Sequence, residues 1–301
     1  MLPDLLLTKI AIADARGVCF EYAPRRIIRE RNNWSAAYFQ HHKYGTGNGK
    51  YSDDAHMSCA VAKTLLLKGA SAEARDFAHQ FVTAFKREST PREGYAGAFY
   101  QFLLSVENTD DFLTRIRPDS DKSGAAMRAG PCGVLGSIDE VPDVAQRQAA
   151  VTHNTRNGVA AAQAAALMVH YLCFDLGPRR DLPQFLDQHV SGHDWGAPHT
   201  GDVGPKGLES VRAALTALLR NNALPDLLID CVEFGGDVDT VCAIAMAAAA
   251  CAADIDQTIP QSLFDDLEND AFGRDYLLAL DQQFAAFAQA QWNAAGAHLP
   301  Q

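Results

Sequence analysis

The chain has 301 residues, 48% of them hydrophobic, so it is long enough for one large domain or two ordinary ones with a sizeable core. Its formal net charge of -11 argues against a nucleic-acid backbone as the main partner, because proteins that bind nucleic acids concentrate Lys and Arg. A surplus of carboxylates suits divalent cations better.

Several absences restrict where the protein works. The seven cysteines are scattered and never form a C-x-x-C pair, a pattern typical of reduced core thiols. The N-terminal stretch MLPDLLLTKIAIADARG lacks the cleavage site of a secretory signal. The apolar run over 241–253 is shorter than the about 20 apolar residues that a bilayer requires. We therefore expect a cytoplasmic protein that does not associate with membranes.

The residue pattern predicts an all-α fold, because Ala and Leu dominate and strand-like alternation is scarce. Apolar stripes with a spacing of four residues predict helices around Leu6–Ala13, Met57–Leu65 and Phe77–Phe85. Further helices are predicted over 95–106, 110–116, 141–151, 158–174, 207–221, 224–233, 240–253 and 275–290. The loops between them are too short for an interdomain linker, so we predict one compact domain over residues 1–301.

The first acidic segment, IADARGVCFEY, places Asp14 and Glu21 on either side of Gly17. A helix end with a surface glutamate would explain it without any function. The flanking Phe20 and Tyr22 instead favour a partly buried Glu21.

Two further acidic segments each precede a helix. In YSDDAHM, the residues Ser52, Asp53 and Asp54 read as a helix N-cap, with carboxylates favoured by the helix dipole. The same cap interpretation applies to the residues in GGDVDT that precede the alanine-rich helix: Asp237, Asp239 and Thr240.

Taken together, these two segments predict a metal site. Both combine two carboxylates with a hydroxyl before a helix rich in small residues, which allow helices to pack closely and bring the two turns to one point. Four crowded carboxylates repel one another, and burying an unpaired one is costly. Two divalent cations would neutralise them, and ligands that are all oxygen suit two Mg²⁺ ions, with Mn²⁺ as the alternative, rather than Zn²⁺.

The order of the motifs resembles that of the ADP-ribosylglycohydrolase family, which includes the ADP-ribosylarginine hydrolases and the dinitrogenase-reductase-activating hydrolase. The likeness spans nearly the whole chain. The motifs that carry it are ADARGVCFE (13–21), YSDDAHM (51–57), SGAAMRAGPCG (123–133), VTHNTRNGVAAA (151–162), GGDVDT (235–240) and GRDYLLAL (273–280).

This resemblance implies an orthogonal all-α bundle with a binuclear magnesium centre in a cleft. Glu21 matches a glutamate that lies beside the metals and gates substrate entry. The metal ligands of the family fall on Ser52, Asp53, Asp54, Asp237, Asp239 and Thr240.

The resemblance also implies a ligand-binding wall. Ser123, Gly124 and Ala125 fall on the loop that holds the pyrophosphate or the nearby ribose, and His153 matches a histidine that contacts the ligand. Read without the family, His153 is a residue at a helix start.

Other polar and aromatic residues have structural interpretations. Met127 is most simply a core residue, Arg128 a buried ion-pair partner, and Trp195 a loop anchor. The chain departs from the family at Ala55, where a threonine is usual, and in the turn that follows His153.

The implied reaction is hydrolysis of the glycosidic bond between ADP-ribose and a protein side chain. A carboxylate among Asp53, Asp54 and Glu21 would take the proton of the attacking water, with Asp54 or Asp53 as the preferred base. The SDD and GAAMRA stretches look more like those of arginine-directed relatives, so arginine is the preferred linkage, and reversal of a toxin's modification is one biological setting. The alternatives are a catalytically inactive ADP-ribose-binding or immunity module, and a scaffolding role.

Overall fold

The computed structural model describes residues 3–34, 37–43, 47–88 and 92–296. The ends of the predicted domain, 1–2 and 297–301, lie outside these ranges. Within them the fold is all-α, and the extended segments form only isolated bridges. The α-helices are α1 (Leu6–Val18), α2 (Arg25–Arg31), α3 (Asp53–Lys68), α4 (Ala74–Arg87), α5 (Gly97–Ser105), α6 (Thr109–Arg115), α7 (Gly124–Met127), α8 (Glu140–Ala150), α9 (Arg156–Cys173), α10 (Leu182–His189), α11 (Gly207–Arg220), α12 (Leu224–Glu233), α13 (Val238–Ala249), α14 (Gln261–Asp265) and α15 (Arg274–Ala294).

All the predicted helices are present, with bounds that differ by a few residues. The alanine-rich helix, predicted over 240–253, is α13 and ends at Ala249, after which the backbone tightens into a turn. The residue pattern does not predict α2, α7, α10 and α14, because these helices are short and have too few turns to show a period.

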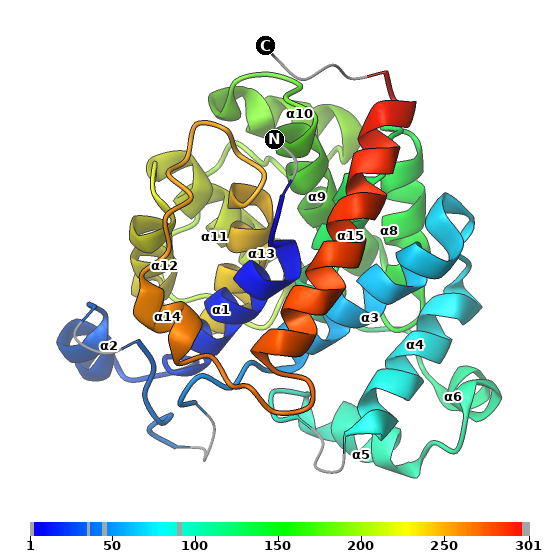
Figure 1. The fold of residues 1–301 in the computed structure, drawn as a ribbon, viewed down its shortest axis with the longest axis horizontal. Helices are drawn as coiled ribbons and strands as arrows, with labels where there is room; N and C mark the ends of the chain where they lie inside the picture. Colours follow the sequence, from blue (N-terminus) through cyan, green and yellow to red (C-terminus); the bar gives the residue numbers. More distant parts are fainter. Residues whose placement is uncertain (1–2, 35–36, 44–46, 89–91, 297–301) are drawn as a thin grey trace.

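Helix α13 lies at the centre of the molecule, and every residue of it is buried. Beyond the first turn, which carries Asp239 and Thr240, its side chains are apolar around the whole circumference, the pattern of a helix enclosed by others. Helices α1, α9, α11 and α12 pack against it, and Figure 1 shows it behind α1 with the other helices around them.

The closest approach of α13 is to α1, at Gly17. A Cβ atom at Gly17 would overlap the Cα of Asp239, in the first turn of α13. The expectation that small residues pack the two acidic helices directly on each other therefore needs correction. The small residues of α13 mainly accept α1, which also packs against α3, so α1 joins the two acidic turns.

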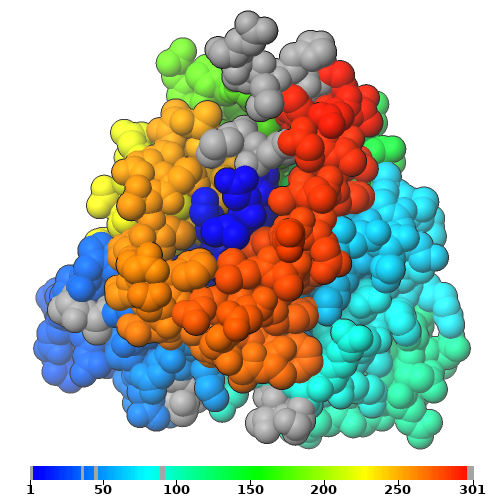
Figure 2. Space-filling view, viewed as in Figure 1, coloured from blue at the N-terminus to red at the C-terminus, as the bar shows by residue number. Residues whose placement is uncertain are grey.

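The residues predicted to form the hydrophobic core are buried in the structure. Within the described ranges all seven cysteines are buried thiols that form no disulfide, as expected for core thiols. On the face shown in Figure 2, the N-terminal helix is enclosed between α15 and the segment that carries α14. Among the described helices, none combines the length and the apolar character needed to cross a membrane.

Candidate metal centre

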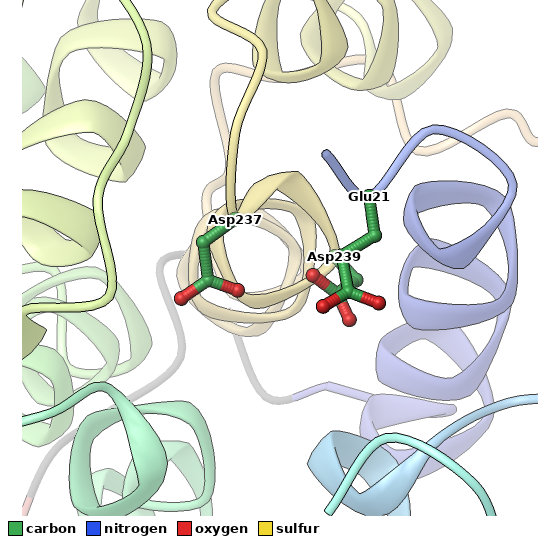
Figure 3. Close-up of side chains that lie close together, drawn as sticks. All are labelled: Glu21, Asp237 and Asp239. Carbon is green, nitrogen blue, oxygen red and sulfur yellow. The ribbon is translucent and has the colours of Figure 1, made fainter. Parts of the chain in front are cut away.

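Three carboxylates from two distant parts of the chain meet at the start of α13. One oxygen from each of Glu21, Asp237 and Asp239 lies within 4.8 Å of the others. Glu21 comes from the turn that follows α1, and Figure 3 shows its carboxylate beside that of Asp239, with Asp237 next to them. The grouping of Glu21 with GGDVDT agrees with the expectation from the motifs.

The loop before α13 leaves its carboxylates free of capping. Asp237 occupies the N-cap position, yet its side chain makes no capping hydrogen bond in the described structure. Backbone bonds hold the loop instead: Asp237 N–H donates to Val203 O at 3.0 Å, and Val203 N–H donates to Gly235 O at 2.8 Å. The N-cap interpretation of Asp237 is therefore wrong.

The loop before α3 behaves differently, because Ser52 does cap its helix. The Ser52 hydroxyl accepts a hydrogen bond from Asp54 N–H at 3.3 Å. Asp53 and Asp54 are both buried in the first turn. The cap interpretation is correct for Ser52, and it leaves the two carboxylates available for another partner.

Asp14 organises this loop, and the sequence pattern did not single it out for that role. This fully buried carboxylate on α1 accepts hydrogen bonds from Ser52 N–H at 2.9 Å, from Ser52 Oγ at 2.8 Å and from Ala55 N–H at 2.9 Å. An aspartate on the apolar side of a helix, before Gly17, is the sequence signal that could have found it.

The same bonds account for the departure at Ala55. Its methyl group is fully buried, and its backbone N–H is satisfied by Asp14. The turn is therefore held by Asp14, with no hydroxyl needed at position 55.

A glycine also presses against this loop. Gly94 has a φ of +106°, and a Cβ there would overlap Asp53 Oδ1 and Ser52 Cβ. The backbone at Gly94 therefore forms a wall that only glycine can supply without displacing Asp53.

Burial raises the pKa of all six carboxylates of this region, and repulsion by neighbouring carboxylates raises it further for four of them. Burial and the charges of Asp14 and its neighbours raise the pKa of Asp53 and Asp54 well above the ordinary range. Burial, Glu21 and Asp54 do the same for Asp239. Burial also raises the pKa of Asp14 and of Glu21 to about 7. The protein thus concentrates negative charge where water cannot screen it.

Nearby cations do not neutralise this charge. Arg92 lies close enough to favour the ionised form of Asp14, but its guanidinium is already bonded to Glu88 at 2.8 Å and paired with Glu268. Burial raises the pKa of Asp237, and Lys122 at the protein surface opposes only part of this rise. Buried carboxylates that lack a matching cation remain ionised only if another source of positive charge is present.

The donor set fits divalent cations. Asp54 Oδ1 and Asp239 Oδ1 are both buried, and neither has a hydrogen-bond partner among the described residues. Asp54 belongs to the first turn of α3 and Asp239 to the first turn of α13. Thr240 lies beside Asp54. Unsatisfied carboxylate oxygens surrounded by further carboxylates and hydroxyls, with no Cys or His among them, are ligands for a hard cation such as Mg²⁺ or Mn²⁺.

Beside the carboxylates stands the predicted ligand-binding wall. The Ser123 side chain lies within hydrogen-bonding reach of Asp237 and opposes part of the rise in pKa that burial causes there. A Cβ at Gly124 would lie 3.0 Å from His153 Cε1 and 3.3 Å from its Nε2, so the histidine covers the start of α7. Ala125 differs from the other two loop residues, because its side chain is fully buried and has no surface to offer a ligand.

His153 is a neutral ring. Its Nδ1 is 2.7 Å from Thr152 Oγ1, and burial, followed by the charge of Arg128, lowers its pKa to about 3. It lies in the turn between α8 and α9, where Thr155, not His153, caps α9. Lys122 lies close to both His153 and Asp237, and it is a cation on this wall that the motifs did not indicate.

The structural interpretations of two large residues have different outcomes. Trp195 is a loop anchor as predicted, since it is 1% exposed and its Nε1 donates to Val190 O at 2.8 Å. Arg128 is buried, but its hydrogen bonds go to Gln148 and Thr152. The predicted ion pair of Arg128 is therefore replaced by hydrogen bonds to neutral groups and by a position of its guanidinium over the Phe81 ring, 4.3 Å from the ring centroid.

An all-α fold that gathers acidic helix starts around unsatisfied carboxylate oxygens defines a class of protein suited to binding divalent cations. The chain belongs to the ADP-ribosylglycohydrolase family, whose model matches residues 10–294. This confirms the family resemblance and places the chain among hydrolases.

Individual relatives agree with the family. The chain is 25% identical over 252 residues to the ADP-ribosyl-[dinitrogen reductase] glycohydrolase of Rhodospirillum rubrum, covering 78% of this chain and 80% of the relative. It is 28% identical over 269 residues to human ADP-ribosylhydrolase ARH3, and the match covers 70% of this chain and 73% of the relative. A solved structure described as an ADP-ribosylglycohydrolase-related protein complex is similar with a TM-score of 0.71 at 21% identity. The match covers 95% of this chain and 97% of that structure, and it confirms the fold.

Proposed function

We propose that the protein is a Mg²⁺-dependent hydrolase that removes ADP-ribose from a modified protein side chain, with arginine as the preferred linkage. The observation that carries this proposal is the pair of buried, unpartnered oxygens, Asp54 Oδ1 and Asp239 Oδ1, one from each acidic loop. A protein that only scaffolds has no use for such oxygens, because each is costly to bury without a cation.

The proposed metal ligands are those of the two acidic helix starts: Ser52, Asp53, Asp54, Asp237, Asp239 and Thr240. Two Mg²⁺ ions held there would supply the positive charge that activates a water and orients the ribose hydroxyls. Asp14 stabilises these ligands indirectly, because it accepts hydrogen bonds from Ser52 and Ala55 and so fixes the turn at the start of α3.

We assign the proton-accepting role to Glu21. Of the three candidate bases, Asp53 and Asp54 are buried, whereas Glu21 is only partly buried. A base has to reach the water and the substrate from the open side of the site. Asp53 and Asp54 then serve as ligands, and their buried position suits that role.

The wall of Lys122, Ser123 and His153 suits the anionic part of the substrate. Lys122 is exposed and supplies positive charge beside the acidic site. A neutral His153 and the Ser123 hydroxyl offer hydrogen bonds to a pyrophosphate or a ribose. In this assignment the charge of Lys122 offsets the repulsion between the diphosphate and the neighbouring Asp237.

The test is to incubate the protein with peptides that carry ADP-ribose on arginine, serine or cysteine, with and without Mg²⁺, and to measure free ADP-ribose. We expect Mg²⁺-dependent release that is fastest from arginine. Release from another linkage alone would reject the arginine preference, while ADP-ribose binding without release would favour the inactive binding module.

A paired variant tests the metal ligands. Joint replacement Asp237→Asn and Asp239→Asn is expected to abolish release, because the second acidic loop then lacks its charge. Full activity in this variant would contradict the proposed metal site. The surface variant Asp143→Asn, at an exposed carboxylate on α8, serves as the control and should retain activity.

A further inference from the structure

Tyr22 has an unusual backbone for an aromatic residue. Its φ is +47°, in the left-handed region that bulky side chains avoid. The other described non-glycine residues with positive φ are Asn48, Asp175 and Asp194, which belong to the residue types that tolerate this conformation. Strain of this kind at a bulky residue persists where the surrounding structure enforces it, often at a functional site.

The strained turn is tied to the acidic site. The Tyr22 N–H donates to Gly236 O at 2.8 Å, directly before Asp237, and Glu21 precedes Tyr22 in the chain. If the turn served only to place Glu21, glycine or asparagine at position 22 would do so with less strain. A tyrosine at this point therefore calls for a role of the ring itself.

The ring is available at the surface. Tyr22 is 51% exposed, so core packing does not account for its presence. After burial, the charges of Asp237, Glu21 and Asp239 are the main causes that raise the pKa of its hydroxyl, and Glu209 contributes as well. Tyr22 thus presents an aromatic face at the rim of the site in strongly negative surroundings.

We propose that Tyr22 recognises the cationic side chain from which ADP-ribose is released, and so selects arginine over serine. The guanidinium of a modified arginine is attracted both by the ring face and by Glu21, the neighbouring carboxylate that is not among the proposed metal ligands. The acetal linkage to a serine carries no charge and gains nothing from either. The anionic diphosphate is drawn to Lys122 instead, so opposite charges on the substrate direct its two ends to different parts of the rim.

This inference rests on the proposed function and concerns its specificity. The experiment compares kcat/KM for peptides with ADP-ribose on arginine and on serine, using the full chain in Mg²⁺. The variants are Tyr22→Phe, which keeps the ring, and Tyr22→Gly, which removes the ring and the backbone strain. Leu67→Ala is the control, because Leu67 is 68% exposed and lies at the far end of α3 from Ser52.

We expect Tyr22→Gly to lower the arginine-to-serine ratio of kcat/KM by about 5- to 30-fold, mainly through KM, as expected for a cation–π contact. Tyr22→Phe and Leu67→Ala should keep the ratio within about twofold of the parent. The thermal midpoint of Tyr22→Gly should equal or exceed that of the parent, because glycine adopts positive φ without strain.

Other outcomes overturn the inference in distinguishable ways. An unchanged ratio together with a lower thermal midpoint for Tyr22→Gly would mean that the ring packs and does not recognise substrate. Release from serine but not from arginine in the parent protein would refute the role of Tyr22 and leave a hydrolase. Release from none of the linkages would overturn the proposed function as well.

Discussion

At the scale of single residues, one aspartate illustrates how the site is supported. Asp14 touches neither of the unpartnered oxygens, yet it holds the loop that carries Asp54 through bonds to Ser52 and Ala55. Its support matters because a carboxylate ligand is useful only where its backbone is fixed. The chain contains a second aspartate with similar bonds, Asp281, which accepts from Leu7 N–H at 2.7 Å and Thr8 N–H at 2.8 Å at the start of α1.

The two aspartates make a matched pair of variants. With saturating Mg²⁺, both Asp14→Asn and Asp281→Asn should lower the free energy of unfolding by about 1–3 kcal/mol, because an amide leaves a buried N–H without its acceptor. Only Asp14→Asn should also weaken Mg²⁺ binding, measured by calorimetry. Equal Mg²⁺ affinity in the two variants would show that Asp14 has no special part in the site.

Replacing the two carboxylates at the start of α13 should have opposite effects on thermal stability without and with Mg²⁺. Without metal, joint replacement Asp237→Asn and Asp239→Asn should raise the thermal midpoint, because it removes buried, mutually repelling charge. With Mg²⁺ the parent should gain stability and the variant should not. Thermal unfolding in chelator and in Mg²⁺ measures both effects, and a variant that is less stable than the parent in chelator would contradict the charge argument.

At the scale of helices, the contact between α1 and α13 sets the geometry of the site. Gly17 lets the two helices approach until the α1 backbone lies against Asp239. The same helix α1 carries Asp14, and the turn after it carries Glu21. A single helix therefore positions carboxylates at the starts of both α3 and α13. Small changes in its packing should displace the proposed metal ligands.

Gly17→Ala tests this coupling. The added methyl group has no room beside Asp239, so α1 and α13 must separate, and we expect a loss of about 1–3 kcal/mol in the free energy of unfolding. Activity should fall more than in Gly97→Ala, because a Cβ at Gly97 meets no atom within 4 Å in the described structure. Denaturant unfolding and ADP-ribose release measure the two effects; similar behaviour of both variants would argue against it.

At the scale of the whole molecule, the buried charge predicts how stability depends on pH. The pKa of Asp14 and of Glu21 is raised to about 7, and those of Asp53, Asp54 and Asp239 are raised well above their ordinary values. A raised pKa means that the folded state holds these protons more tightly than the unfolded state. The stability that they contribute is present at low pH and is lost as pH rises through the folded-state pKa.

The window for this measurement is about pH 6.5 to 8, where the folded protein releases the protons of Asp14 and Glu21. Below it, buried histidines such as His153, whose pKa is lowered to about 3, act in the opposite direction, since they take up protons on unfolding below their ordinary pKa of about 6.5. In chelator, the free energy of unfolding should fall across this window, by up to about 1.4 kcal/mol per pH unit for each carboxylate that is protonated in the folded state and ionised in the unfolded state. Mg²⁺ should flatten the curve. A metal-free protein whose stability is constant over this window would contradict the buried-charge interpretation.

The sequence by itself determined the fold class, most of the helices and the two acidic helix starts. Helical periodicity and short motifs are local properties, so they survive in the order of residues. The sequence also led to the family, because several ordered motifs carry more information than any one of them. The capping role of Ser52 followed from local rules as well.

Only the tertiary structure decided which carboxylates are free and what supports them. Asp237 and Ser52 both stand before a helix, yet only Ser52 caps, because capping depends on the side-chain rotamer and the neighbouring backbone. The bonds of Asp14 to Ser52 join residues 38 positions apart, and the fit of Gly17 against Asp239 joins residues still more distant. Contacts of this kind depend on how helices pack in space, and no local pattern in the chain records them.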